Sequence, residues 1–205
     1  MKVISLISGG IDSPVSTYFM LRSGVEVVAL HLDNRPFTDD KQVNKALELV
    51  KHLEKLFEIE IKTYVIPHAK NQASFARNCK RKLGCVLCKR MMLRIAEEIA
   101  VKEGADAIVT GDSLGQVASQ TLQNLRVETQ SISIPILRPL IGFDKNDIIE
   151  VARDIGTYEV SILPGLCCTI VPKKPATEAK LEAILREEVK ADIDLLMKES
   201  MDWAI

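Results

Sequence analysis

Apolar and polar positions along the chain follow two periods that alternate with each other. Short apolar runs rich in β-branched residues predict buried strands over residues 3–7, 25–32, 59–66, 105–110 and 132–136. Segments between them, in which apolar residues recur every three or four positions, predict helices over residues 15–22, 40–57, 86–103, 115–125 and 145–155. The proline within the last run places that strand at an edge. This alternation indicates an α/β fold, a mostly parallel sheet covered by helices on both faces.

The C-terminal part of the chain departs from this pattern. Residues 177–200 are highly charged and predict one or two helices with no strand between them. We therefore expect one main domain over residues 1–175 and a C-terminal helical extension over residues 176–205. The sequence contains no internal repeat and no low-complexity segment.

Composition narrows the class of protein. The 205 residues are 47% hydrophobic but only 4% aromatic, which predicts a soluble protein with a mainly aliphatic core. No apolar run reaches membrane-spanning length, and the N-terminus begins with a strand, so we expect a cytoplasmic protein without a membrane partner. A net charge of −1 restricts any RNA contact to a local surface. Five cysteines in a reducing compartment favour metal binding or catalysis over disulfides.

The first predicted strand runs directly into SGGIDS at residues 8–13, and a helix follows. Glycines allow a ligand to approach the backbone closely, and the free N–H groups at a helix start favour an anion. The hydroxyls of Ser8 and Ser13 add donors. Asp12 would repel a phosphate unless Mg²⁺ lies between them. A second polar turn, residues 111–113, follows another strand. Because the carboxyl ends of parallel strands share one edge, both turns are expected to face one pocket.

These stretches resemble known families. SGGIDS resembles the SGGxDS loop of the PP-loop ATP pyrophosphatases, which bind ATP and adenylate a substrate. GDSLGQVASQTL at residues 111–122, CKRMMLRIA at 88–96 and CCTIVPKKP at 167–175 resemble segments of the ThiI family, the tRNA 4-thiouridine sulfurtransferases. VALHL at residues 28–32 is similar to the family's adenine-binding strand. The resemblance covers nearly the whole chain up to about residue 175.

The resemblance implies a three-layer, adenine nucleotide alpha hydrolase-like fold of the HUP group. It implies ATP and Mg²⁺ as cofactors, with Asp12 and Cys168 as catalytic residues and Asp12 near the metal, directly or through water. Mapped onto this sequence, the nucleotide-binding residues would be Leu6, Ile7, Ser8, Gly9, Gly10, Asp12, Ser13, His31, Leu32, Lys89, Gly111 and Gln120.

The cysteines leave three chemical alternatives. Sulfur transfer suits a thiolate, whose pKa a basic setting such as Lys89 and Arg90 would lower. By family analogy the catalytic thiol is Cys168. Alternatively, an iron–sulfur cluster would be held by Cys85, Cys88 and either Cys168 or its neighbour Cys167, as in archaeal family members with such a triplet. The remaining alternative is a structural zinc ion, although adjacent residues are awkward tetrahedral ligands.

A run of basic residues from 77 to 94 contains no acidic residue. Such a run is either a solvated face or a patch for tRNA phosphates, and residues 77–82 fit both. Lys89 and Arg90 are expected at the pocket instead.

By resemblance, the O4 of a uridine attacks the α-phosphate of ATP, pyrophosphate leaves, and sulfur then displaces AMP to give 4-thiouridine. The sulfur donor would be a cysteine desulfurase or free sulfide. The chain begins at the PP-loop strand without the family's THUMP and rhodanese domains, so tRNA docking is expected from a separate protein, with a homodimer as a further expectation. Sulfur transfer to the thiamine thiazole, a PP-loop enzyme acting on another acceptor, and a non-enzymatic ATP or iron–sulfur module are the alternatives.

Overall fold

The computed structural model describes residues 1–116 and 119–202. Its centre is a single five-stranded sheet in which all neighbouring strands are parallel, in the order β3-β2-β1-β4-β5. The strands are β1 (Lys2–Leu6), β2 (Glu26–Asp33), β3 (Thr63–Pro67), β4 (Ala107–Val109) and β5 (Ile136–Leu137). The predicted α/β fold is therefore confirmed, and β5 lies at an edge as its neighbouring proline indicated.

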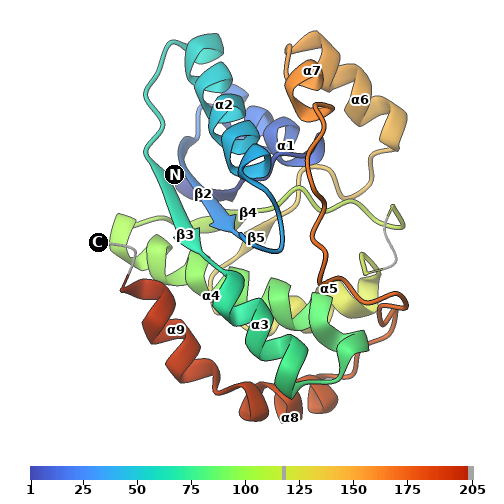
Figure 1. Cartoon of the computed structure of the whole chain (residues 1–205). Helices are drawn as coiled ribbons and strands as arrows, with labels where there is room; N and C mark the ends of the chain where they lie inside the picture. The colour runs from blue at the N-terminus through green and yellow to red at the C-terminus, as the bar shows by residue number, and fades with distance from the viewer. Residues whose placement is uncertain (117–118, 203–205) are drawn as a thin grey trace.

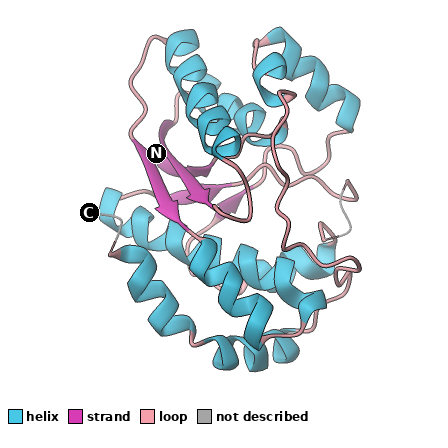
Figure 2. Cartoon of the chain, viewed as in Figure 1, coloured by secondary structure: helices cyan, strands magenta, loops and turns pink. Residues whose placement is uncertain are grey.

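Helices cover both faces of this sheet, as Figures 1 and 2 show. One face carries α1 (Asp12–Arg22), α2 (Asp40–Phe57), α6 (Lys145–Asp154) and α7 (Tyr158–Ser161). The other carries α3 (Ala69–Asn78), the 3₁₀ turn η1 (Arg81–Leu83), α4 (Gly84–Glu103) and α5 (Leu122–Thr129). Outside this second layer lie α8 (Leu181–Ala191) and α9 (Ile193–Met201).

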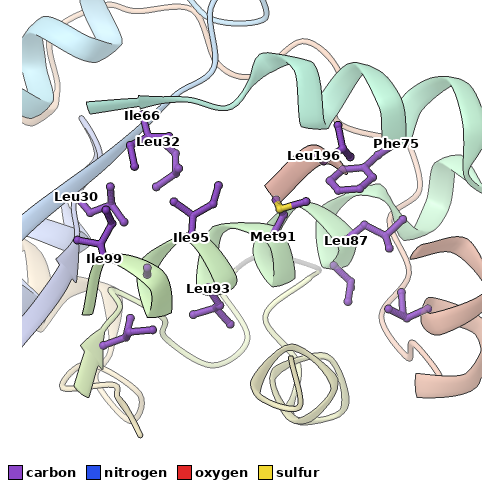
Figure 3. Close-up of a cluster of buried hydrophobic side chains, with 14 of the residues drawn as sticks. Leu30, Leu32, Ile66, Phe75, Leu87, Met91, Leu93, Ile95, Ile99 and Leu196 are labelled. Atoms are coloured by element: carbon purple, nitrogen blue, oxygen red, sulfur yellow. The ribbon is translucent and has the colours of Figure 1, made fainter. Parts of the chain in front are cut away.

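Alternate residues of the strands pack into two separate hydrophobic cores, one on each face of the sheet, because successive side chains of a strand point to opposite faces. In β2, Val28 and Leu30 pack with α4, whereas Val27 and Ala29 pack with α2 on the other face. Figure 3 shows the first of these cores, with Met91 and Ile95 of α4 at its centre. A strand buried on both faces must be apolar at consecutive positions, which is why these strands appear in the sequence as continuous apolar runs.

Several predicted boundaries differ from the observed ones, and three of the differences have a clear local cause. The third strand begins at Thr63 rather than residue 59, because Glu58 adopts a left-handed conformation and the chain turns there. The helix predicted over residues 115–125 begins only at Leu122, after a turn in which Gly115 has a φ of +74°. Thr121 caps that helix by accepting a hydrogen bond from the Asn124 N–H. Residues 117–118, within the predicted helix, lie outside the described residues. The fifth strand follows Pro135 instead of containing it.

The C-terminal helices are packed against the second layer. Ile184 and Leu196 are buried in the same core as Met91, and Figure 3 places Leu196 beside Phe75 of α3. Glu188 of α8 forms ion pairs with Arg90, at 2.8 Å, and with Arg94, at 2.6 Å. The extension over residues 176–205 as a separate domain stays a prediction. None of the described helices is long and apolar enough to cross a membrane.

Candidate functional site

The turn between β1 and α1 forms the first part of the site. Ser13 accepts a hydrogen bond from the Ser8 N–H at 2.9 Å and donates one to the Ser8 carbonyl at 3.2 Å, which closes the turn on itself. No side chain caps the start of α1, so its first N–H groups are available to a ligand. An anion placed in this turn would meet these donors and the positive end of the helix dipole.

The second glycine turn packs directly against the first. A Cβ on Gly111 would lie 2.9 Å from the backbone nitrogen of Ser13, so only glycine fits. Ser16 of α1 donates a hydrogen bond to the carbonyl of Thr110 at 2.9 Å, which joins the two turns. Both turns line one cavity of about 230 Å³, as expected from their positions at the carboxyl ends of β1 and β4.

Part of the lining of this cavity, called the nucleotide cavity below after the ligand that the sequence resemblance implies, is an apolar wall, and another part is a charged wall. The apolar wall consists of Leu6, Leu30, Leu32, Met92 and Leu93. In the charged wall, the Lys89 ammonium lies 2.8 Å from Asp112 and 3.7 Å from Glu128. Arg138 lies 3.4 Å from Asp112, and Gln120 donates to the same carboxylate at 3.3 Å. This arrangement suits a ligand with a flat apolar part and a polar part.

Burial and the nearby positive charge of Lys89 shift the pKa values of the two carboxyl groups in the charged wall in opposite directions. The Lys89 ammonium holds the pKa of Asp112 below its usual value, although burial opposes this effect. Burial raises the pKa of Glu128 to about 7, because Lys89 only partly offsets the cost of removing its charge from water. The Oε1 atom of Glu128 is buried without a hydrogen-bond partner among the described residues.

A larger cavity of about 810 Å³ adjoins the glycine turn on its other side. Asp12 forms an ion pair there with Lys145, beside the turn of residues 8–13, which is called the phosphate turn below after the ligand that the sequence resemblance implies. His31 is buried in the wall, and its Nδ1 lies 2.9 Å from the Ile7 carbonyl. Burial lowers the pKa of this imidazole, so it is neutral at pH 7. Gly9 also lines this cavity.

Three of the cysteines meet in a third cavity of about 270 Å³. Cys85 and Cys88 of α4 and Cys168 of the C-terminal segment line it, and Lys89 borders both this sulfur cavity and the nucleotide cavity. Cys167 is exposed and faces the 810 Å³ cavity instead. Among the described residues, no three His, Cys, Asp or Glu side chains are grouped closely enough to hold a metal ion. Cys85, Cys88 and Cys168 therefore share one cavity, and a metal or cluster site on them stays a prediction.

Two expectations about the basic setting are wrong. Arg90 is buried against Glu188 and the Val127 carbonyl, on a different side of α4 from the cavities. Burial raises the pKa of Cys85, and it raises the pKa of Cys88 to about 12, so neither thiol is activated in the way proposed for a basic setting.

The structure also adds polar residues that the sequence patterns did not single out. Lys145 and Glu128 reach the nucleotide-side cavities from α6 and α5, and His68 and Gln72 reach Cys88 from the start of α3. Each sits in an ordinary helical segment of the sequence without a motif around it. The one available signal was position: a residue just after the carboxyl end of a parallel strand, such as His68 after β3, lies near the ligand edge.

Comparison with known proteins agrees with this geometry. The family model described as "Thiamine biosynthesis protein (ThiI)" matches residues 1–193. A "Probable tRNA sulfurtransferase" from Methanosarcina mazei is 42% identical over 204 residues, which are 99% of this chain and 50% of the relative. A protein of the same name from Caldanaerobacter subterraneus is 46% identical over 193 residues, 93% of this chain and 50% of the relative. The chain thus spans about half the length of the curated relatives it matches.

A solved structure is similar over nearly the whole chain. It is described as "Crystal structure of a 4-thiouridine synthetase - RNA complex with bound ATP" and matches with a TM-score of 0.94 at 36% identity. The match covers 98% of this chain and 53% of that chain. The predicted PP-loop, adenine nucleotide alpha hydrolase-like fold is therefore confirmed. Since the family model also spans all five strands and both glycine turns, the chain belongs to the ThiI family.

Proposed function

We propose that this chain is the catalytic part of an ATP-dependent sulfurtransferase that adenylates a uridine in tRNA and replaces its O4 with sulfur, giving 4-thiouridine. The observation that carries this proposal is the shared position of Lys89. Its side chain borders the nucleotide cavity and the cavity that contains Cys85, Cys88 and Cys168. A carbonyl activated on the nucleotide side would meet a sulfur atom without leaving the site. The names of the family relatives and of the ATP-bound structure support the same reaction.

In the activation step, the turn of residues 8–13 would bind the phosphates of ATP through its N–H groups and hydroxyls, and Leu30 and Leu32 would contact the adenine. The uridine O4 attacks the α-phosphorus, and pyrophosphate leaves with the electron pair of the broken P–O bond. Lys89 and Lys145 are placed to stabilise the negative charge that develops on the phosphates.

Asp12 fits a magnesium ion. Its carboxylate is partly exposed in the 810 Å³ cavity beside the phosphate turn, and carboxylate oxygens are the ligands that Mg²⁺ prefers. The ion would neutralise phosphate charge. Lys145 holds this carboxylate in the structure and would keep it oriented toward the turn.

In the transfer step, the terminal sulfur of a Cys168 persulfide adds to C4 of the adenylated uridine and AMP leaves, which gives a disulfide between Cys168 and C4. A second cysteine thiolate of the cavity would attack the Cys168 sulfur, release 4-thiouridine and form a cysteine disulfide that an external thiol reduces. Where free sulfide is the donor, it would add to C4 directly. Cys168 is the residue we assign to sulfur delivery, because it lines both the sulfur cavity and the cavity beside the phosphate turn. An iron–sulfur cluster on Cys85, Cys88 and Cys168 stays a prediction.

The proposal extends to partners. The chain spans about half of its relatives' length, and a tRNA-docking module, within the same protein or separate, would complete the enzyme. A cysteine desulfurase or free sulfide would supply sulfur. Pairing of two copies and a cytoplasmic location, where tRNA is found, belong to the same proposal, as does a second role in supplying the thiamine thiazole.

The experiment is complementation in cells from which the gene has been deleted, because all partners are then present. Bulk tRNA nucleosides are analysed by mass spectrometry after return of the native gene or of single variants. We expect the native chain to restore 4-thiouridine and Asp12→Asn and Cys168→Ser to leave it absent. The matched control is Cys79→Ser, a buried cysteine outside the cavities whose Sγ donates to the Glu187 carbonyl.

Two results would overturn the proposal. Undiminished 4-thiouridine in the deletion strain would exclude tRNA as the acceptor and favour another PP-loop acceptor. Full restoration by Cys168→Ser would exclude Cys168 as the sulfur-delivering residue. Anaerobic purification with iron and acid-labile sulfide measured per chain tests the cluster separately, and a chain without iron that is active in vitro would exclude it.

A further inference from the structure

His68 is a buried imidazole that contacts the sulfur of Cys88. It follows the carboxyl end of β3, its exposed fraction is 0%, and its Nε2 lies 3.3 Å from Cys88 Sγ. A fully buried imidazole without an acidic partner is neutral and carries a single N–H. Which nitrogen holds that hydrogen decides whether His68 donates to the sulfur or accepts from it.

A chain of hydrogen bonds from the C-terminal helix α9 decides this question. Ser200 donates its hydroxyl hydrogen to the Leu196 carbonyl at 2.8 Å, so its oxygen accepts from the Asn71 amide at 3.0 Å. The second hydrogen of the same amide points to His68 Nδ1, also at 3.0 Å. Nδ1 is therefore an acceptor, and the imidazole hydrogen lies on Nε2, directed at Cys88 Sγ.

Gln72 supplies a second donor to the same sulfur. Asn34 donates to the Leu32 carbonyl at 3.2 Å, which turns its amide oxygen toward Gln72 and fixes the Gln72 NH₂ group there at 2.7 Å. The other hydrogen of this NH₂ points to Cys88 Sγ at 3.5 Å. On the opposite side, the Gln72 oxygen accepts from Cys168 Sγ at 3.5 Å. Toward Gln72, Cys88 therefore accepts and Cys168 donates, while the thiol hydrogen of Cys88 is directed at Met92 Sδ, at 3.9 Å.

We propose that His68 is a positioning residue of the sulfur site, held by Asn71 and Ser200 in the Nε2–H form so that it donates to Cys88 Sγ and fixes the orientation of that sulfur. N–H groups directed at a sulfur stabilise electron density on it and fix its orientation. Cys85 receives no such hydrogen bond from any residue in the described ranges. The two cysteines of the CxxC pair therefore differ, and the difference is built by α3 and α9. This inference rests on the proposed function for its effect on sulfur transfer, but its geometry does not.

The geometry is tested by ¹⁵N nuclear magnetic resonance of the labelled native chain. The sequence contains only three histidines, so long-range proton–nitrogen correlations resolve each ring after one substitution apiece. We expect His68 to show a protonated Nε2, an unprotonated Nδ1 and a nuclear Overhauser effect from the Nε2 hydrogen to the Cys88 β-hydrogens. An Nδ1–H ring in the native chain would overturn the proposal.

Asn71→Asp tests the origin of this form, because a carboxylate can only accept from Nδ1 and should move a hydrogen onto that nitrogen. Asn78→Asp is the matched control on the same helix, since the Asn78 amide is exposed and contacts only Ser74, at 3.2 Å. An unprotonated Nδ1 in folded Asn71→Asp would show that Asn71 does not set the form, which contradicts the proposal.

The role in sulfur transfer is tested by two substitutions of His68 in the complementation strain. His68→Gln places an N–H near the position of Nε2 and should keep most 4-thiouridine. His68→Leu removes the donor and should lower the initial rate of thiolation by about two- to tenfold, the usual value of a single hydrogen bond. Thermal unfolding and ATP affinity, measured on both purified variants, should match each other.

Equal thiolation by the Gln and Leu variants would overturn the role of the donor. If the native chain itself forms no 4-thiouridine, the proposed function fails, while the resonance experiment still judges the hydrogen-bond chain.

Discussion

Replacing Gly111 with alanine tests the contact on which the nucleotide cavity depends. The added Cβ would lie 2.9 Å from Ser13 N and 3.0 Å from both Asp12 C and Ser13 Cα. All three are backbone atoms at the start of α1, so no side-chain rotation can relieve the overlap. The phosphate turn would have to move by several tenths of an ångström away from β4.

The magnitude follows from the cost of forcing extra volume into a packed site, about 1–3 kcal/mol. In the free protein the turn can shift and relieve part of this strain, but a bound phosphate requires the turn to return. We therefore expect the dissociation constant of ATP to rise by about 5- to 140-fold, since 1.4 kcal/mol is a factor of ten. Any strain that is not relieved in the free protein lowers the free energy of unfolding instead.

Isothermal titration calorimetry with ATP measures the loss of affinity, and urea unfolding of the same preparations measures the loss in the free energy of unfolding. Gly142→Ala is the matched control, because its added Cβ would meet no atom within 4 Å and should change neither quantity. If Gly111→Ala keeps both the affinity and the stability of the native chain, the two turns are not in the contact described, and the assignment of the phosphate site is refuted.

Three further predictions concern charged groups. Glu188→Gln leaves two arginines without their carboxylate and should lower the free energy of unfolding by about 3–5 kcal/mol in urea titrations. Glu182→Gln, which removes one partner of an exposed ion pair, should change it by less than about 1 kcal/mol. Equal losses in the two variants would contradict the buried pair. The pKa of Glu128 is raised to about 7 from 4.5, so the folded chain retains a proton that the unfolded chain releases. The free energy of unfolding, relative to that of Glu128→Gln, should therefore fall by on the order of 3 kcal/mol as the pH rises from about 4.5 to 7. Parallel pH profiles of the two proteins would exclude this shift. Lys145→Met should weaken ATP binding about tenfold in calorimetry through loss of a charged contact, and native affinity would place this amine away from the phosphates.

Much of the fold was predictable because its signals are local. The strands that form the centre of the sheet are apolar at consecutive positions, and the 40–57 helix has a period that no strand shares. The late start of the helix at Leu122 could not be predicted, because a cap by Thr121 and a left-handed glycine interrupt an otherwise helical pattern. Likewise, Pro135 marked an edge strand but not which side of the proline would pair.

The candidate site was predictable where residues follow a strand or belong to a motif. The two glycine turns and Lys89 are examples. The hydrogen-bond and ion-pair partners of the site residues could not be predicted, because they come from distant segments. Glu188 lies 98 residues after Arg90, and Ser200 lies 129 residues after Asn71. A helical pattern reveals that a residue is polar or apolar, but the identity of its partner depends on how the outer helices fold back.

The periodicity of α4 nevertheless explains why Lys89 and Arg90 have different roles. Successive residues of a helix are about 100° apart, so neighbours in sequence cannot face one cavity equally. Cys85, Cys88, Lys89 and Met92 are spaced as i, i+3, i+4 and i+7 and line the sulfur and nucleotide cavities. A second row, Leu87, Met91 and Ile95, fills the core in Figure 3.

A third row of α4, Arg90 and Arg94, turns to Glu188 of α8. One helix therefore lines the sulfur cavity and the nucleotide cavity and packs against the outer helical layer, and each of these contacts depends on its phase. Insertion of a single residue between Lys89 and Arg90 would rotate the second half of the helix by about 100° relative to the cysteines. Met92 would leave the nucleotide wall, and the arginines would lose their carboxylate. The position of this helix, more than any one side chain, places the sulfur atoms beside the nucleotide cavity.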